Sequence, residues 1–227
     1  MPSFVLYSYW RSSCAWRVRI ALNLKKAEYE YKTVNLLSAD ALSDPTFRAV
    51  NPAGKVPALV VDGQPLTESL AIIEYLDEIF PDVSPLLPQD PIQRAQARAI
   101  ALQITAGIQP IQNLRVLKHV NSLIPNSGQQ WAKHWLSDGL RDLENMLSRT
   151  SGCYAVGNSI TVADLCIPSI VYNARRYESP LLSFLLPLNG VEVEQFPTLC
   201  KVNDNLSKIP EFIAAEANNQ PDAQLNA

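Results

Sequence analysis

Three small polar side chains, Ser12, Ser13 and Cys14, come one after another just past a short apolar run. The run from Phe4 to Tyr9 has the composition of a strand, and the residues from about Ser12 to Lys26 have the apolar pattern of a helix. The start of a helix presents N–H groups that have no intrahelical acceptor, together with the positive end of the helix dipole. Such a place favours an anion or a thiolate, so these three residues are candidates for holding one.

Simpler roles for the same residues stay open. Ser12 or Ser13 could act only as an N-cap, and Cys14 could be a small buried apolar residue. Dithiol exchange is disfavoured because a resolving cysteine would stand at position 17, where the chain has arginine. The helix is expected to carry its cations on its outer side, and three arginines strengthen the positive bias of its start: Arg11, Arg17 and Arg19.

The elements that must position these residues can be read from periodicity and turn chemistry. Alternation from Tyr29 to Thr33 predicts a second strand, parallel to the first. After a short helix near Asp44 to Val50, the Asp62-Gly63 pair between Ala58–Val61 and Gln64–Thr67 predicts a hairpin. Helical spacing from Glu68 to Phe80 completes the order βαβ then ββα, which is that of a thioredoxin-like domain at residues 1–82.

Proline punctuation separates this domain from the rest of the chain. The proline-rich residues 83–91 predict a linker, and no strand is expected in residues 92–227. The predicted helices span about 92–120, with a kink at Pro110, then 129–148 and 161–177. Thr161 and Asp164 form a capping-box pattern at the last of these, and the polar residues from Ala217 onward are expected to fray. The second domain is therefore predicted to be all-helical.

Composition excludes several classes of function. The chain has 227 residues, is 47% hydrophobic and carries a net charge of −3, with no basic run that suggests a nucleic-acid partner. No signal peptide or membrane-spanning run is evident, so the protein is expected to be soluble and cytoplasmic, with no membrane partner. Four cysteines without paired spacing and two histidines predict reduced thiols and no metal site.

The motif SSCAWRVRIAL at residues 12–22 resembles the signature of zeta-class glutathione transferases, the maleylacetoacetate isomerase family. Further matches are NPAGKVPAL, ESLAIIEYL, IQPIQNLRVL and TVADLC, so that the resemblance covers about residues 3–213. It implies the glutathione transferase fold, with glutathione as the cofactor. It also implies a homodimer.

The resemblance implies a glutathione site along the edge of the first domain. Val56, before an expected cis Pro57, would pair with the cysteinyl backbone, and Glu68 and Ser69 would hold the γ-glutamyl end. Lys55 could bind the glycyl carboxylate or remain solvated. A glutamine that relatives carry after the second strand has no clear counterpart between Ala39 and Asp44. The complete implied set is Ser12, Ser13, Cys14, Ala15, Trp16, Arg17, Lys55, Val56, Glu68, Ser69, Gln109, Asn113, Leu114 and Arg115.

The implied reaction is cis–trans isomerisation of maleylacetoacetate to fumarylacetoacetate in tyrosine and phenylalanine catabolism. Ser12 is the leading candidate to hydrogen-bond the glutathione thiolate, assisted by Ser13 and Cys14. Arg11 and Arg176 are candidates for the substrate carboxylates, although either could be a solvated charge and Arg175 lies beside Arg176. The same site would serve glutathione transfer to small α-halo acids.

The segment around Pro110 is implied to line the cleft and to reach the partner subunit's glutathione. Gln109, Gln112 and Asn113 carry this role, and interhelical hydrogen bonding is the alternative for their amides. Three other functions stay open for the chain as a whole: a general detoxifying transferase, a non-catalytic module of the same fold, and a dithiol oxidoreductase.

Overall fold

The computed structural model describes residues 2–176 and 191–223, without the side chains of residues 39 and 176. Contacts within the chain group these residues into two units. The first runs to Leu86 and resumes at Lys208, and the second runs from Leu87 to Ser207. The boundary after Leu86 falls inside the predicted linker. The C-terminal segment, in contrast, groups with the first unit, whereas the prediction placed all of residues 92–227 in the helical domain.

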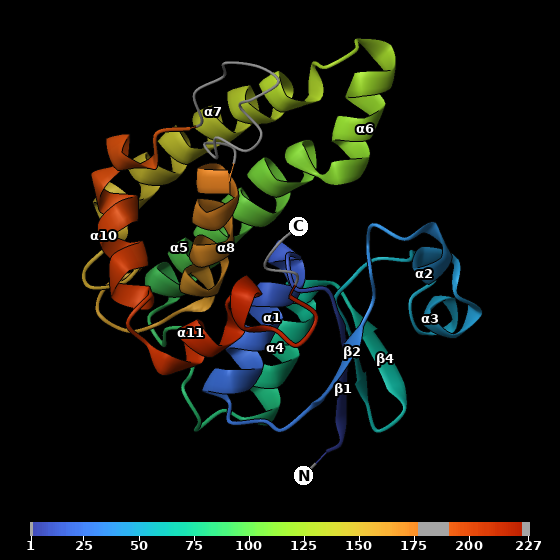
Figure 1. Cartoon of the computed structure of the whole chain (residues 1–227). Helices are drawn as coiled ribbons and strands as arrows, with labels where there is room; N and C mark the ends of the chain where they lie inside the picture. The colour runs from blue at the N-terminus through green and yellow to red at the C-terminus, as the bar shows by residue number, and fades with distance from the viewer. Residues whose placement is uncertain (1, 177–190, 224–227) are drawn as a thin grey trace. The chain divides into compact units, whose positions relative to one another are not determined.

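The first unit consists of β1 (Phe4–Ser8), α1 (Ser13–Leu24), β2 (Glu30–Thr33), α2 (Ala39–Ser43), α3 (Pro45–Val50), β3 (Ala58–Val61), β4 (Gln64–Thr67), α4 (Ser69–Ile79), α11 (Pro210–Ala215) and the 3₁₀ turn η4 (Ala217–Asn219). The strand order is β2-β1-β3-β4, with β1 and β2 parallel and the other neighbours antiparallel. Helices α1 and α4 lie on one side of the sheet, with α2 and α3 on the other (Figure 1). The predicted thioredoxin-like order is confirmed.

The predicted hairpin has the expected turn. Asp62 and Gly63 have φ values of 47° and 84°, the positive values that a type I′ turn needs. The sheet packs on α1 and α4 through apolar side chains that are almost fully buried, and burial of each contributes roughly 1.5–3 kcal/mol. The largest are Leu6, Ile20, Leu22, Leu59, Ile72, Ile73 and Leu76.

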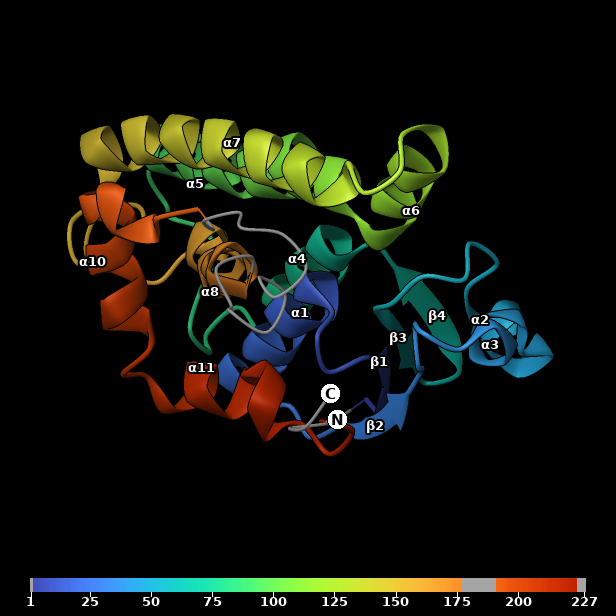
Figure 2. The same ribbon diagram turned by 45° about the horizontal axis from the view of Figure 1, so that its top comes forward.

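The second unit is helical in its described residues and consists of α5 (Pro91–Leu102), the π-helical η1 (Gln103–Ile108), the 3₁₀ turn η2 (Gln109–Gln112), α6 (Leu114–Leu123), α7 (Gly128–Thr150), α8 (Val162–Arg176), the 3₁₀ turn η3 (Val193–Gln195) and α10 (Pro197–Leu206). Helices α5 and α7 run side by side (Figure 2). Apolar residues at helical spacing along them form the core of this unit, among them Ile100, Ile104, Leu136, Leu140 and Leu143.

The helix predicted over about 92–120 is interrupted rather than only kinked. The chain passes from α5 through a π turn and a 3₁₀ turn before α6 begins. Pro110 supplies no N–H to a helix, and Asn113 adopts an extended conformation with ψ of 145°. The Asn113 side chain accepts a hydrogen bond from the Arg115 N–H at 3.1 Å, so it starts a new helix as an N-cap.

The predicted capping box at the start of α8 is present. The Asp164 carboxylate accepts hydrogen bonds from the Thr161 N–H at 2.8 Å and the Thr161 hydroxyl at 2.9 Å. It also accepts one from the Ala155 N–H at 2.8 Å, which ties the preceding loop to the helix. Burial nevertheless raises the pKa of Asp164 to about 6, because the desolvation of the charged form outweighs these donors.

The C-terminal residues fold onto α1 as far as the structure describes them. The Asn23 side chain donates to the Glu211 carbonyl at 2.9 Å. The Gln220 side chain donates to the carbonyls of Ala214 and Glu216 at 2.9 and 2.8 Å. Asp222 accepts hydrogen bonds from the Trp10 N–H and the Tyr31 hydroxyl, at 3.1 and 2.7 Å. Gln220 and Asp222 thus have hydrogen-bonded positions, which differs from the expectation that the residues from Ala217 onward fray.

Candidate active site

The strand register brings three chain segments to one end of the sheet. Tyr7 on β1 pairs with Ala58 on β3, and Ala58 pairs with Thr67 on β4. The residues that come after β1, before β3 and after β4 therefore lie at the same end. These segments are the turn that leads to Ser12, the Val56–Pro57 peptide and the start of α4 at Ser69.

Ser12 is the N-cap of α1. Its extended backbone has φ of −72° and ψ of 113°, and its Oγ accepts a hydrogen bond from the Ala15 N–H at 3.2 Å. Because the oxygen acts as the acceptor in this bond, the hydroxyl hydrogen can still be donated to another group. Ser13 is buried and Cys14 is half-buried, both in the first turn of the helix. Capping and binding of an anion are thus compatible roles for Ser12.

The two arginines predicted on the outer side of α1 are instead inside the first unit. The exposed fraction is 1% for Arg17 and 0% for Arg19. Their neighbours Ala15 and Trp16 are also buried, at 0% and 4%. Arg17 Nη1 donates to the Ser69 hydroxyl oxygen at 3.2 Å, which joins the starts of α1 and α4. Hydrogen bonds within the unit offset part of the cost of burying these two cations. The prediction of solvated arginines was wrong.

The loop before β3 presents the backbone of Val56. The Val56–Pro57 peptide is cis, as expected, and Val56 is buried. Buried Asn51 holds this loop, because its side chain donates to the Lys55 carbonyl at 2.6 Å and accepts from the Ala53 N–H at 3.0 Å. The Lys55 side chain itself is exposed.

The start of α4 combines a strained residue with a buried hydroxyl. Glu68 has φ of 67° and ψ of 112°, a conformation that costs a residue other than glycine roughly 1–3 kcal/mol. Such strain is found most often where a ligand is held. Exposed Glu68 precedes buried Ser69, whose hydroxyl oxygen already accepts from Arg17. A carboxylate bound here would meet the N-terminus of α4 and an arginine behind it.

Arg11 lies at the same sheet end, in the turn before Ser12. Its guanidinium carbon is 4.1 Å from the centroid of the Trp10 ring, a cation–π contact with a buried indole. This contact fixes where the half-buried Arg11 side chain stands. A positive charge therefore lies directly before the run of three polar residues that starts α1.

The remaining predicted residues belong to the second unit. Gln109 is half-buried in η2, whereas Asn113, Leu114 and Arg115 are exposed at the start of α6. Gln112 is buried, and its amide nitrogen has no hydrogen-bond partner among the described residues. The side chain of Arg176 lies outside the described residues. Arg175 is exposed, with Nη2 3.9 Å from a Glu194 carboxylate oxygen.

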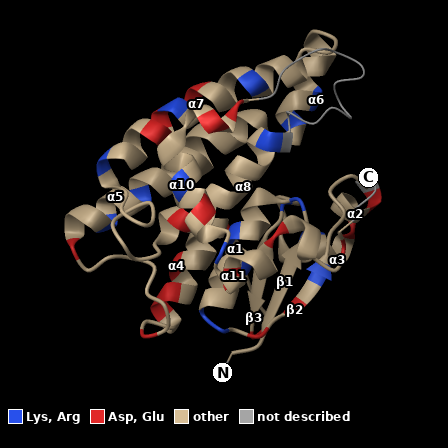
Figure 3. Ribbon diagram, turned by 60° about the vertical axis from the view of Figure 1, so that its left-hand side comes forward, with Lys and Arg blue, Asp and Glu red and all other residues tan. Residues whose placement is uncertain are grey.

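Charge is unevenly spread over the second unit. No acidic residue occurs between Asp90 and Asp138, a stretch that carries Arg94, Arg98, Arg115, Lys118 and Lys133. Figure 3 shows basic but no acidic residues along α6. In a chain with a net charge of −3 this stretch is locally cationic, which attracts anionic small molecules at low ionic strength.

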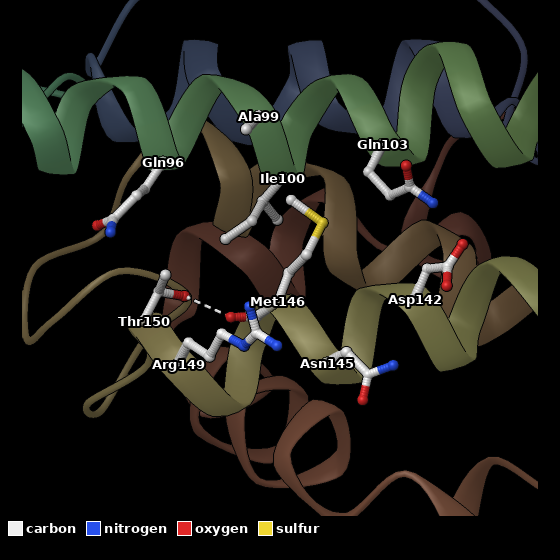
Figure 4. A pocket seen from close by; sticks show the side chains of 9 residues that line it. All are labelled: Gln96, Ala99, Ile100, Gln103, Asp142, Asn145, Met146, Arg149 and Thr150. Carbon is white, nitrogen blue, oxygen red and sulfur yellow. Dashed lines mark hydrogen bonds between the residues drawn. The ribbon is translucent and has the colours of Figure 1, made fainter.

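Other site types find little support in the described residues. No three His, Cys, Asp or Glu side chains there gather in a way that could hold a metal ion, and no helix among them could cross a membrane. An open hollow of about 480 Å³ lies between α5 and α7 (Figure 4). It is lined by Gln96, Ala99, Ile100, Gln103, Asp142, Asn145, Met146, Arg149 and Thr150, none of which is a predicted site residue.

Sequence reasoning missed three residues that shape the sheet end. Trp10 supports Arg11, Asn51 holds the loop before Val56, and Asp222 accepts a hydrogen bond from the Trp10 N–H at 3.1 Å. The Asn51-Pro52 pair was a turn signal that could have suggested the role of Asn51. Nothing local marked Asp222, which is 212 positions from its partner.

Comparison with known proteins identifies relatives of the whole chain. Residues 11–79 match the family model described as "Glutathione S-transferase, N-terminal domain". A Caenorhabditis elegans protein named as a probable maleylacetoacetate isomerase is 53% identical over 223 residues, which are 98% of this chain and 97% of that protein.

Solved structures agree with this relationship. The maleylacetoacetate isomerase of Anaeromyxobacter dehalogenans 2CP-1, with dicarboxyethyl glutathione and citrate bound, is 37% identical, with a TM-score of 0.84 and 98% of each chain covered. A bacterial zeta-class maleyl pyruvate isomerase in its holo form is 33% identical, with a TM-score of 0.87, covering 97% of this chain and 100% of that one. This chain belongs to the family of zeta-class glutathione transferases and maleylacetoacetate isomerases.

Proposed function

We propose that this protein catalyses the glutathione-dependent isomerisation of maleylacetoacetate to fumarylacetoacetate, in tyrosine and phenylalanine catabolism. The observation that carries the proposal is the meeting of Ser12, Val56 and Ser69 at one sheet end, in a chain whose relatives bear this activity in their names. Transfer of glutathione to small α-halo acids is a second activity of the same site, because both reactions need an anion pocket beside an activated thiolate.

The donors and acceptors at the sheet end fit glutathione. The γ-glutamyl carboxylate meets the N-terminus of α4 and Ser69, and Glu68 accepts from the ammonium group. The Val56 backbone offers an N–H and a carbonyl to the cysteinyl residue, as an added strand would. Arg17 donates to Ser69 and adds positive charge near the γ-glutamyl carboxylate. Exposed Lys55 lies next to Val56 in the loop before β3 and binds the glycyl carboxylate.

Activation of the thiol falls to the start of α1. A thiol with a pKa of about 8.5 needs about 2.7 kcal/mol of preferential thiolate stabilisation to lower that pKa by two units. A hydroxyl hydrogen bond to a charged sulfur contributes about 1.5–3 kcal/mol, and a helix N-terminus about 0.3–1 kcal/mol. The Ser12 hydroxyl and the first turn of α1 together are of this size, with Ser13 and Cys14 assisting.

When bound, glutathione supplies a thiolate that adds to the conjugated double bond of the substrate and leaves again after rotation. Arg11 and Arg176 hold the substrate carboxylates and stabilise the negative charge that develops on the substrate oxygens. The cationic stretch of the second unit concentrates the anionic substrate near the protein. Arg11 and Arg176 bind the substrate more strongly as negative charge develops on it, and catalysis requires binding that is stronger in the transition state than in the ground state.

The assembly belongs to the proposal as well. We infer a cytoplasmic homodimer, in which Gln109, Asn113, Leu114 and Arg115 contact glutathione, in part across the subunit interface.

The test is the conversion of maleylacetoacetate by the purified protein, with and without glutathione, beside the variant Ser12→Ala. Turnover should require glutathione without consuming it. Loss of one hydrogen bond to a charged sulfur should lower kcat/KM roughly 10- to 150-fold in S12A. The matched control Ser148→Ala removes an exposed serine hydroxyl from α7 and should retain full activity.

Three outcomes would contradict the proposal. Weak and nearly equal rates on maleylacetoacetate and on an α-halo acid would favour a general detoxifying transferase. Glutathione binding without turnover would favour a non-catalytic module. An S12A variant as active as S148A would remove Ser12 from the mechanism.

A further inference from the structure

The turn that leads from β1 into α1 sets the position of the residues proposed for chemistry. It is closed by a hydrogen bond from the Ser12 N–H to the Tyr9 carbonyl at 2.9 Å. Trp10 and Arg11 occupy its two central positions, and Ser12 comes directly after them as the N-cap of α1. Any shift of this turn therefore moves the Arg11 guanidinium and the Ser12 hydroxyl together.

Arg19 holds the carbonyl side of this turn from within the unit. Its Nη2 donates to the Trp10 carbonyl at 3.2 Å, and its Nη1 reaches the Tyr9 carbonyl at 3.5 Å. The same guanidinium donates from Nε and Nη2 to the Ala215 carbonyl, at 3.1 and 2.9 Å, at the end of α11. One buried cation thus joins the turn to the C-terminal part of the chain.

Asp222 holds the other side of the turn. Its Oδ2 accepts from the Trp10 N–H at 3.1 Å, and its Oδ1 accepts from the Tyr31 hydroxyl at 2.7 Å. Both polar backbone groups of Trp10 are therefore bonded, one to Asp222 and the other to Arg19. Burial lowers the pKa of Arg19 to about 10, and the negative charge of Asp222 is among the groups that oppose this shift.

The segment that carries Asp222, Pro210–Ala223, is anchored independently of the turn. The Asn23 side chain on α1 donates to its Glu211 carbonyl, and the Gln220 side chain folds the segment on itself. We call these residues the C-terminal strap. Because the strap is attached to α1 at one end and to Trp10 at the other, it can hold the turn in a fixed position relative to α1.

We propose that the C-terminal strap, through Asp222, is a positioning device for the thiolate-activating turn, and that Asp222 is a positioning residue for the reaction. The inference rests on the proposed function for its catalytic consequence. Asp222 acts on Trp10, which supports Arg11 by stacking and lies in the same hydrogen-bonded turn that ends at Ser12. Its loss should weaken thiolate activation and substrate binding more than it weakens the binding of glutathione by Val56 and Ser69.

The experiment uses the full-length protein and the variants Asp222→Ala, Tyr31→Phe and Asn218→Ala. Y31F removes the donor to Oδ1 and leaves the Trp10 contact. N218A is the matched control, since Asn218 is an exposed polar residue of the same strap. The probe is glutathione itself, whose thiolate absorbance is titrated against pH in the bound state, and hydrogen exchange of the peptide that contains Trp10 is measured without ligand.

In D222A the pKa of the bound thiol should rise by about one unit, the equivalent of one hydrogen bond of ordinary strength. Exchange at Trp10 should become faster, and the Kd for glutathione should change by less than about threefold. Y31F should shift the thiol pKa in the same direction by a smaller amount. N218A should match the wild type in all three measurements.

A folded D222A variant with unchanged thiol pKa and unchanged Trp10 exchange would overturn the inference, as would an equal shift in N218A. A lower Tm in D222A with unchanged thiol pKa would assign the strap a structural role only. If the wild type bound no glutathione, the proposed function would fail, and faster Trp10 exchange in D222A would still support the strap's hold on the turn.

Discussion

Removal of the Lys25 ammonium should destabilise the first unit strongly. Lys25 closes α1, and its side chain is 0% exposed. Nζ lies 2.6 Å from Asp77 Oδ1 and donates to the carbonyls of Phe80, Val83 and Ser84, at 3.1, 2.7 and 3.0 Å. The ammonium thus ties α4 and the proline-rich segment after it to the end of α1.

The expected size can be worked out from these contacts. Removing one partner of a buried ion pair costs about 3–5 kcal/mol, because the other charge remains in a poorly solvated place. The Asp77 side chain is 14% exposed and keeps a hydrogen bond from the Leu86 N–H, so the lower end applies. We expect Lys25→Met to lower the free energy of unfolding by about 3 kcal/mol, which corresponds to a fall in Tm of roughly 6–12 °C.

Urea unfolding followed by tryptophan fluorescence measures this change, because Trp10 and Trp16 are buried in the first unit. Lys26→Met is the matched control, since Lys26 carries the same charge on the exposed side of the same helix end. It should change the free energy of unfolding by less than about 0.5 kcal/mol. The double variant K25M/D77N should be more stable than the sum of the single effects predicts. A K25M variant as stable as K26M would refute the reasoning.

Two further predictions concern the second unit. Asp164→Asn replaces one acceptor oxygen by a donor and should destabilise the protein. Burial raises the pKa of Asp164 to about 6 in the folded protein, so its stabilising contribution is fully present below pH ~4 and is lost as pH rises through about 6. The difference in free energy of unfolding between the wild type and D164N, measured by urea titration, should therefore shrink by about 3 kcal/mol over that window. A pH-independent deficit would contradict this. Gly139→Ala would place a Cβ 2.5 Å from the Ile108 side chain, so we expect a loss of about 1–3 kcal/mol in the same assay, against none for an alanine at exposed Ser148.

The elements that depend on near neighbours were predictable from sequence. The hairpin at Asp62-Gly63, the N-cap at Ser12 and the capping box of Thr161 and Asp164 all involve residues within a few positions of one another. Turn and cap chemistry act over this range, so residue types and spacing suffice. The interruption before α6 was less accessible, because the pattern showed a proline but not that Asn113 would begin a new helix.

The places of Ser12 and Ser69 at helix starts were predictable from sequence, and the burial of the arginines near them was not. Local pattern placed Arg17 and Arg19 on a solvated face, yet both are buried, because Ser69 and Ala215 supply oxygens from elsewhere in the chain.

The sequence alone determined which side chains stand at the start of α1 and at the start of α4, since helix starts are encoded locally. Only the tertiary structure decided which cations are buried and that Asp222 holds Trp10. The physical reason is that a charge can leave water only where several partners converge, and here those partners come from segments up to about two hundred residues apart.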